Sequence, residues 1–158
     1  MKLACLLLGA VAYAQAAASD FPSFDIFHSH CAINVLIPGK LCTNVYQSVI
    51  NTIDSFNAGK DHSHGVYTYK EIQRISYVWV VHDSKRGWDS DVIFEPTQIG
   101  NDCQIRGRSR TKSTFHSAGT ENYCDIWNVY MNIGAGSNKM DVSSCSSIPK
   151  DPTTTCSQ

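Results

Sequence analysis

Residues 66–82 decide the fold class, and they read Val-Tyr-Thr-Tyr-Lys-Glu-Ile-Gln-Arg-Ile-Ser-Tyr-Val-Trp-Val-Val-His. They divide into two extended segments, 66–74 and 75–82, with no helical segment between them. The second segment shows a period of two, the pattern of a strand. One set of its side chains is Ile75, Tyr77, Trp79 and Val81, and the other is Ser76, Val78, Val80 and His82. Consecutive strands joined by a short turn predict an antiparallel meander.

Further elements lie on both sides of this pair. Residues 31–37, 91–95 and 103–115 are strand candidates, with Pro96 expected to end the second of them. A helix over residues 43–56 is indicated by one apolar face with a 3.6-residue period. Its members are Val45, Tyr46, Val49, Ile50, Ile53 and Phe56. A second helix is expected at 122–133. This order predicts an α+β domain: an antiparallel sheet of four to five strands, one or two helices on one face, and disulfide bracing.

The N-terminus has the pattern of a secretory signal peptide. Lys2 supplies a positive charge, residues 3–11 are apolar, and small residues dominate 12–19. Three alanine pairs, at positions 12/14, 14/16 and 16/18, fit the cleavage rule equally well. The apolar run is far shorter than the roughly 20 residues that span a bilayer. We therefore expect export, an extracellular location and no membrane span.

The cysteine count supports that location. Cys5 belongs to the leader, and the mature chain keeps Cys31, Cys42, Cys103, Cys124, Cys145 and Cys156. An even number in an exported chain is typical of a disulfide framework. We expect Cys103–Cys124, because these residues bracket the long strand and the start of the next element. The local pairs Cys31–Cys42 and Cys145–Cys156 would complete the set.

The composition changes after residue 133. Ser, Thr, Gly, Asn and Pro dominate 134–158, and apolar residues nearly vanish, so this segment cannot order itself by burial. We expect a signal peptide at 1–19, a single domain at 20–133, and a tail at 134–158 that its two cysteines tether.

The charge balance excludes some partner classes. Loss of Lys2 with the leader leaves 12 basic and 14 acidic side chains, a formal net charge of −2. Nothing in that balance indicates nucleic acid or an anionic membrane as a partner.

The strongest candidate site is a row of cations in the long strand. Arg106, Arg108, Arg110 and Lys112 occupy every second position, so in a strand they share one face. Arginine pairs with oxyanions in a bidentate manner, which indicates a site for phosphate, sulfate, carboxylate or an anionic glycan. The alternative interpretation is a solvated outer face, with Ile105, Gly107, Ser109 and Thr111 turned inward.

Two further patterns contain groups that can bind metals or transfer protons. His28/His30 and His62/His64 form His-Ser-His motifs that suit zinc or copper on a strand. They lie in polar segments without an evident acidic partner, so we expect no metal and no cofactor. A second set resembles the Glu, Arg and His of small fungal ribonucleases, which lie on an antiparallel sheet packed against one helix. Its members here are Glu71, Arg74, His82 and His116.

Aromatic residues form another candidate set: Tyr67, Tyr69, Tyr77, Trp79, Trp88, Phe94, Tyr123 and Trp127. They could stack against sugars or line an apolar pocket between the helix at 43–56 and the sheet. The alternative is core packing.

A longer pattern extends through residues 89–128. It comprises Asp89-Ser-Asp-Val-Ile-Phe94, Cys103-Gln-Ile-Arg-Gly-Arg-Ser-Arg110, and Gly119-Thr-Glu-Asn-Tyr-Cys124 with Trp127-Asn128. This resembles an uncharacterised family of small secreted proteins from protists, oomycetes and algae, with D-D-x-x-F, C-x-I-x-x-x-S-x-S and D-x-G-T-N-Y-C-N motifs. It is also similar to a bacterial and plastid family that ends R-S-x-S-R, then D-x-G-x-N. Here Ser117 replaces the expected Asp, and Glu121 interrupts G-T-N. The resemblance implies a fold and export, and it transfers no catalytic residue.

Together these features favour a secreted, non-enzymatic binding or structural module for an anionic or small apolar ligand. The alternative is a secreted hydrolase of the ribonuclease type. The two differ in whether Glu71, Arg74 and His116 converge in one cleft.

Overall fold

The computed structural model describes residues 20–59, 65–84, 87–114 and 119–156. The signal peptide expected at 1–19 lies outside this part of the chain. The described strands form one antiparallel sheet in the order β2-β3-β4-β5-β1-β6. They are β1 (His30–Ile37), β2 (Gly65–Gln73), β3 (Tyr77–Ser84), β4 (Asp89–Ile99), β5 (Asp102–Thr111) and β6 (Met140–Ser143). The α+β class with an antiparallel sheet is confirmed.

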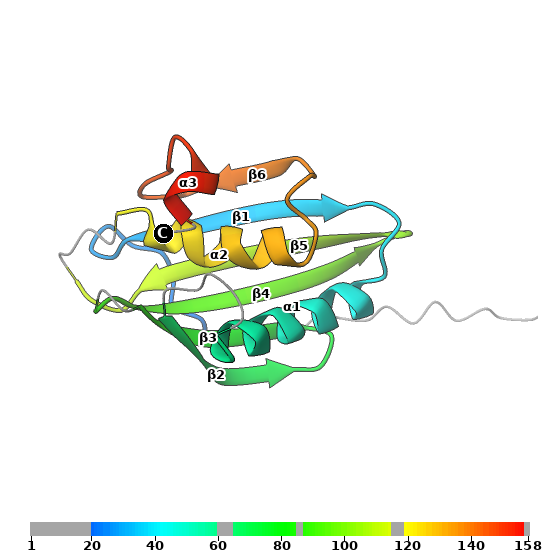
Figure 1. The fold of residues 1–158 in the computed structure, drawn as a ribbon, viewed down its shortest axis with the longest axis horizontal. Helices are drawn as coiled ribbons and strands as arrows, with labels where there is room; N and C mark the ends of the chain where they lie inside the picture. Colours follow the sequence, from blue (N-terminus) through cyan, green and yellow to red (C-terminus); the bar gives the residue numbers. More distant parts are fainter. Residues whose placement is uncertain (1–19, 60–64, 85–86, 115–118, 157–158) are drawn as a thin grey trace, which may run out of the picture.

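Two long helices cover one face of this sheet (Figure 1). They are α1 (Cys42–Asn57) and α2 (Glu121–Asn132), and the short α3 (Pro152–Cys156) packs beside α2. The apolar face of α1 that the sequence predicts is buried against the sheet through Val45, Val49, Ile53 and Phe56. No helix in the described ranges is long and apolar enough to cross a membrane.

Helix α2 lies close to the sheet because β5 has a glycine at the contact. A Cβ on Gly107 would lie 2.4 Å from the side chain of Ile126 and 2.9 Å from the hydroxyl of Tyr130. That hydroxyl is within hydrogen-bond distance of the carbonyls of Ile33 (2.9 Å) and Ile105 (3.1 Å). Gly107 therefore sets how closely the helix and the sheet approach.

The opposite face, here called the outer face, has its own smaller apolar cluster. Residues 20–29, which we call the strap, run across it before β1 begins. Phe21 packs on Trp79 with ring centroids 5.5 Å apart, and the cluster also contains Tyr77 and Ile93. The strap thus covers part of a sheet face that would otherwise expose large aromatic side chains.

Strand β4 is longer than the sequence pattern indicates. Pro96 was expected to end it, yet the strand continues to Ile99. Strand β3 pairs with β4 only as far as Phe94, whereas β5 pairs along its whole length. Beyond Phe94 one side of β4 has no neighbour among the described strands, and such an edge tolerates a residue without an N–H.

All six cysteines within the described residues are paired, but the expected partners are wrong. The disulfides are Cys31–Cys145, Cys42–Cys103 and Cys124–Cys156, which join residues 114, 61 and 32 positions apart. The expectation assumed local loops. In the structure β5 returns beside β1, so Ile37 pairs with Cys103 and the start of α1 comes next to it. The tail likewise returns to β1, which brings Cys145 to Cys31.

The tail is also more ordered than its composition indicates. Strand β6 extends the sheet by pairing with residues 32–35 of β1, and α3 carries Cys156 to Cys124 of α2. Main-chain hydrogen bonds and two disulfides order this segment without an apolar core of its own. The tail is therefore joined to the sheet through β1 and to α2 through Cys156.

Candidate functional site

The row of cations lies on the outer face, as its spacing predicts. In β5, Cys103, Ile105, Gly107 and Ser109 are buried beneath the helices, and Arg106, Arg108 and Arg110 alternate with them. Lys112 follows directly after the strand, and its backbone N–H donates to the carbonyl of Asp89 at 2.8 Å. Arg106 and Lys112 are exposed, whereas Arg108 and Arg110 are half-buried.

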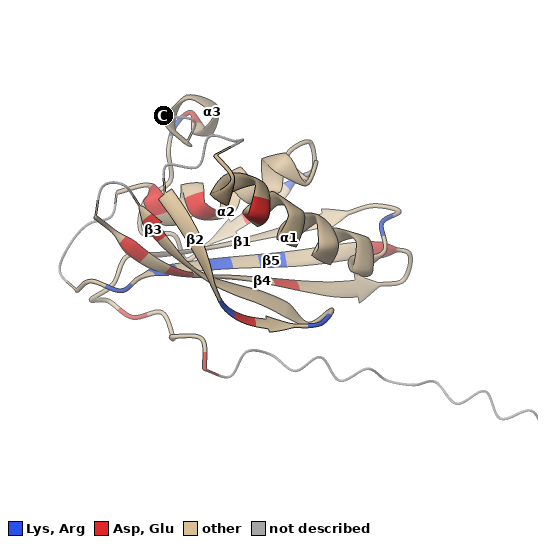
Figure 2. Ribbon diagram, turned by 60° about the horizontal axis from the view of Figure 1, so that its bottom comes forward, with Lys and Arg blue, Asp and Glu red and all other residues tan. Residues whose placement is uncertain are grey.

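A row of acids on β4 lies beside these cations. In the register of the two strands, Asp91 is opposite Arg110 and Glu95 is opposite Arg106. Figure 2 shows the basic positions of β5 next to acidic positions of β4. Opposite charges on neighbouring strands stabilise a sheet. The face is therefore charge-complementary within the protein and is not the purely cationic surface that the spacing of β5 alone indicates.

Arg108 is held by two neighbouring residues of the protein itself, Glu95 and Phe21. Its Nε and Nη2 donate to the two oxygens of Glu95, both at 2.9 Å. On its other side the guanidinium lies 4.4 Å from the ring centroid of Phe21 in the strap. The bidentate ion pair neutralises the charge of Arg108 and uses its Nε–Nη2 edge, and the cation–π contact covers one face of the guanidinium. The geometry weighs against Arg108 as a ligand residue.

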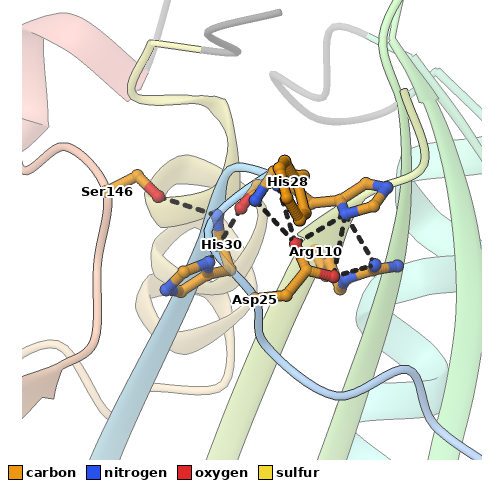
Figure 3. Close-up of polar contacts among 6 residues, drawn as sticks. Asp25, His28, His30, Arg110 and Ser146 are labelled. Atoms are coloured by element: carbon orange, nitrogen blue, oxygen red, sulfur yellow. Dashed lines mark hydrogen bonds and ion pairs between the residues drawn. The ribbon is translucent and has the colours of Figure 1, made fainter. Parts of the chain in front are cut away.

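Arg110 holds the far end of the strap (Figure 3). Its Nη2 donates to Oδ2 of Asp25 at 2.7 Å and lies 2.7 Å from Nδ1 of His28. Nδ1 of His28 is also 2.8 and 2.9 Å from the two Asp25 oxygens. The hydrogen bond from Arg110, followed by that from His28, holds the pKa of Asp25 well below its usual range. The carboxylate of Asp25 is thus held between the guanidinium of Arg110 and the imidazole of His28.

His28 can use Nδ1 in only one way at a time. With a proton it donates to Asp25, and without one it accepts from Arg110. Its Nε2 makes no hydrogen bond to the described residues and is not among their buried, unsatisfied atoms. The Asp25–His28 pair therefore resembles the orientation of a general base, with the second ring nitrogen directed away from the acid.

The two histidines of this His-Ser-His motif face different partners. The Nδ1 atom of His30 bonds the carbonyl of His28 at 2.8 Å, and its ring stacks on Phe24 at 4.4 Å. The backbone N–H of His30 donates to the hydroxyl of Ser146 in the tail at 3.0 Å. Both side chains are part-buried rather than exposed loop histidines. Within the described ranges no group of three or more His, Cys, Asp or Glu residues could hold a metal. The motif at His62/His64 lies outside these ranges.

A second histidine–aspartate pair is buried on the helix side of the same end of the sheet. Nδ1 of His82 on β3 donates to Oδ1 of Asp125 on α2 at 2.7 Å. The hydroxyl of Ser109 on β5 is 2.8 Å from Oδ2 of the same carboxylate. The amide of Asn122 links Ser109 to Thr111, at 2.8 and 2.9 Å. Ser109 and Asn122 both belong to the pattern on which the family resemblance rests.

This buried cluster ties α2 to two strands, β3 and β5. Burial lowers the pKa of His82, but the charge and hydrogen bond of Asp125 outweigh it, so the pKa lies above its ordinary value. Tyr67 stacks on the imidazole with ring centroids 4.3 Å apart. Nε2 of His82 has no hydrogen-bond partner among the described residues. It faces Gly65, where a Cβ would come within 2.5 Å of it. The cluster therefore links α2 to the sheet through buried polar side chains.

The described members of the ribonuclease-like set do not converge. The carboxylate of Glu71 accepts a hydrogen bond from Tyr77 on the outer side, and Arg74 lies in the turn after β2. His82 points to the helix side near the opposite end of β3. His116 lies outside the described residues. Glu71 and His82 therefore cannot act on one substrate atom in this arrangement.

The aromatic candidates divide between the two faces. Tyr67, Phe94 and Tyr123 belong to the main core, and Tyr77 and Trp79 lie beneath the strap. The indole N–H of Trp79 donates to the buried Asp91 at 2.9 Å, and the ammonium of Lys70 lies 3.8 Å from its ring centroid. These rings pack and anchor the protein itself, as the core-packing interpretation expects.

The strap was not recognised from the sequence as a functional segment. Its Phe21 and Phe24 are three positions apart, a spacing that suits one face of a helix and does not indicate a segment laid across a sheet. The acidic row was within reach, because Asp91 and Glu95 share one face of the strand candidate at 91–95 and Asp89 continues the same alternation. Reading both rows together would have indicated charge pairing across two strands.

Comparison with known proteins adds little to this geometry. No protein-family model matches the chain, and no curated protein matches it. Among solved structures, a crystal structure of protein CV1439 from Chromobacterium violaceum is similar at 7% sequence identity with a TM-score of 0.46. The match covers 66% of this chain and 95% of that one. So low a similarity carries no argument about function.

Proposed function

We propose that this chain is an exported, disulfide-braced module that acts by binding through the end of the outer face where the strap meets Arg110. The observation that carries the proposal is the fixed turn at Asp25. Its carboxylate is bonded to the mostly buried side chains of Arg110 and His28, while Ile26 and Phe27 next to it in the turn are exposed. A preformed surface binds with less loss of conformational freedom than a flexible one.

Export is supported by the covalent framework. Three disulfides tie β1, α1 and α2 to segments far away in the sequence. Such bonds persist in oxidising compartments, and the leader pattern of residues 1–19 agrees with that location.

Mass spectrometry of secreted material tests the export step. We expect a mature N-terminus between residues 15 and 20 and three intact disulfides. Recovery of the chain from the cell interior with Met1 and free thiols would refute export.

A hydrolase is the second candidate, and one observation favours it. Asp25 orients His28 as an acid orients a general base, and Nε2 of His28 is available for a proton transfer. A catalytic site would also need a nucleophile beside Nε2, whereas Arg110 contacts Nδ1 of His28.

Activity assays separate the two candidates. Purified protein would be tested against ester, phosphodiester and RNA substrates beside a His28→Gln variant, which keeps a polar side chain at the same place. The binding proposal expects no turnover by either form. Turnover that His28→Gln abolishes, with the fold unchanged, would establish the hydrolase instead.

A further inference from the structure

The tail is joined to the sheet by a disulfide that lies near the surface. Cys145 follows β6 closely and is bonded to Cys31 of β1. Cys145 is half-buried, whereas the other cysteines of the described residues are at most 8% exposed. Thiol–disulfide exchange requires that a thiolate reach one of the two sulfurs. Among the three described disulfides, Cys31–Cys145 is therefore the one that a reductant reaches first.

Strand β6 has little burial to hold it when this bond is broken. None of its four residues is buried, and it is the last strand in the described sheet. It pairs with residues 32–35 of β1, and its Met140 and Val142 are only partly buried against the core. A segment with few buried apolar contacts opens at a low cost in free energy. Reduction should therefore allow β6 to leave β1.

The residues next to the disulfide join the tail to the start of β1 (Figure 3). Ser146 follows Cys145, and His30 precedes Cys31. The N–H of Ser146 donates to the carbonyl of His30 at 2.8 Å, and the N–H of His30 donates to the hydroxyl of Ser146 at 3.0 Å. Without the disulfide, this pair would depend on two hydrogen bonds at the surface, which contribute little where water competes.

His30 in turn supports the strap. Its Nδ1 bonds the carbonyl of His28 at 2.8 Å, and its ring stacks on Phe24 with centroids 4.4 Å apart. Between the two histidines, the carbonyl of Ser29 accepts a hydrogen bond from the N–H of Thr111 on β5 at 2.9 Å. A displacement of His30 therefore acts on the end of the strap that the proposed function uses.

We infer that the Cys31–Cys145 disulfide is a redox-controlled clasp for this end of the strap. The inference rests on the proposed binding function and adds its regulation. In the closed state the disulfide holds β6 and Ser146 on β1. In the open state both leave β1, and the strap loses the support that Ser146 gives through His30. A partner that needs the preformed surface then binds less tightly.

The co-reactant is a dithiol reductant, such as an oxidoreductase with a C-x-x-C pair. Its thiolate attacks Sγ of Cys145 and forms a mixed disulfide, while Sγ of Cys31 leaves as a thiolate and takes up a proton. The second thiol of the reductant then attacks the mixed disulfide and releases Cys145 as a thiol. Two electrons pass to the protein, and the reductant becomes a disulfide.

The tail stays attached to the domain in the open state. Cys124 and Cys156 are 8% and 1% exposed, and their bond holds α3 on α2. A tethered segment meets its former partner at a high effective concentration. Oxidation therefore restores the same pair, which makes the clasp reversible.

Timed reduction of the folded wild-type chain tests the order in which the bonds open. The probe is dithiothreitol at low concentration; samples are quenched, unfolded, alkylated and mapped by peptide mass spectrometry. We expect Cys31 and Cys145 to be alkylated about tenfold faster than the four other cysteines. Simultaneous reduction of all three disulfides, or earlier reduction of either other one, would overturn the inference.

Hydrogen exchange tests the link to the strap. The N–H of Thr111 bonds Ser29 in the strap, and the next N–H, that of Lys112, bonds Asp89 on β4 and is the internal control. We expect partial reduction to speed the exchange of the Thr111 amide about tenfold and to leave Lys112 unchanged. Equal changes at both amides, or no change at Thr111, would contradict the coupling and overturn the clasp.

A permanently open variant, Cys31→Ser with Cys145→Ser, should show the same difference without reductant. The matched control is Cys124→Ser with Cys156→Ser, and a faster exchange of Thr111 in both variants would also overturn the inference. Should the open variant not fold, the partly reduced wild type alone decides. Neither measurement needs a partner: their failure removes the clasp and leaves the binding proposal standing. Retention in cells or turnover of substrate would refute the proposed function and leave the order of reduction unchanged.

Discussion

Nδ1 of His82 and the carboxylate of Asp125 are 2.7 Å apart in a buried contact between β3 and α2. Because the pKa of His82 is raised in the folded protein, the folded state binds a proton that the unfolded chain releases near pH 6.5. The stabilisation is fully present below about pH 6.5 and is lost as the pH rises through the folded pKa.

Asp125→Asn should remove this dependence. We expect it to lower the free energy of unfolding by about 3 kcal/mol at pH 6, the usual cost of breaking a buried pair, and to flatten the fall in stability above that pH. Urea denaturation across pH 5 to 9 measures both effects. Asp141→Asn, at an exposed position of β6, is the control. An unchanged pH slope in Asp125→Asn would contradict the assignment.

The bidentate contact between Arg108 and Glu95 gives a second prediction. Arg108→Ala removes two charge-assisted hydrogen bonds and the contact with Phe21, and both charged side chains are less than a fifth exposed. We expect a loss of about 1–2 kcal/mol in the free energy of unfolding. Arg106→Ala on the same face of the same strand should change it by less than about 0.5 kcal/mol. Equal, negligible effects of both substitutions would mean that Arg108 is as solvated as Arg106.

The sequence predicted the individual strands and helices of this fold better than it predicted which of them lie side by side. Alternation marked β3 and the 3.6-residue period marked α1, because each pattern depends on local geometry and one buried face. That β5 returns beside β1 is not encoded in any local period. The cysteine partners follow from that topology, so a pairing based on proximity in sequence was wrong for Cys31, Cys42 and Cys103.

The candidate site shows the same division. The shared face of Arg106, Arg108 and Arg110 was predictable from their spacing. The carboxylate partners of these arginines were not predictable, since Glu95 lies on another strand and Asp25 lies in a segment for which the sequence predicted no helix or strand. Whether a cation is free for a ligand depends on such tertiary partners.

The disulfide that joins α1 to β5 should have a large effect on stability. Cys42–Cys103 joins residues 61 positions apart, and the loop-entropy model gives about 4 kcal/mol for a loop of that size. We expect the double substitution Cys42→Ser and Cys103→Ser to lower the free energy of unfolding by roughly that amount. Peptide mapping of the wild type should recover this pair, and a peptide that links Cys31 to Cys42 would contradict it.

Gly107→Ala should separate α2 from the sheet. The added methyl group would overlap Ile126, and overpacking of a core costs about 1–3 kcal/mol. Ile126→Ala should also destabilise, because it leaves a cavity. The double variant should be more stable than the two losses predict, since the smaller side chain makes room for the methyl group. Strict additivity in this double-mutant cycle would show that the two positions are not in contact.

The turn between β2 and β3 offers a stabilising substitution. Ile75 has a φ of 65°, a left-handed conformation that is costly for a β-branched residue. The N–H of Ser76 donates to the carbonyl of Gln73 at 2.9 Å, which places Ile75 third in a four-residue turn, where glycine is favoured when φ is positive. Its side chain is 41% exposed, so little packing is lost on removal. We expect Ile75→Gly to raise the free energy of unfolding by about 0.5–1 kcal/mol, as relief of strain exceeds the entropy cost of glycine.

Ile72→Gly, at a similarly exposed position in β2, should lower the free energy of unfolding by about the same amount. Denaturant midpoints of the two variants decide the matter: a parallel fall in both would mean that the contacts of Ile75 outweigh its backbone strain.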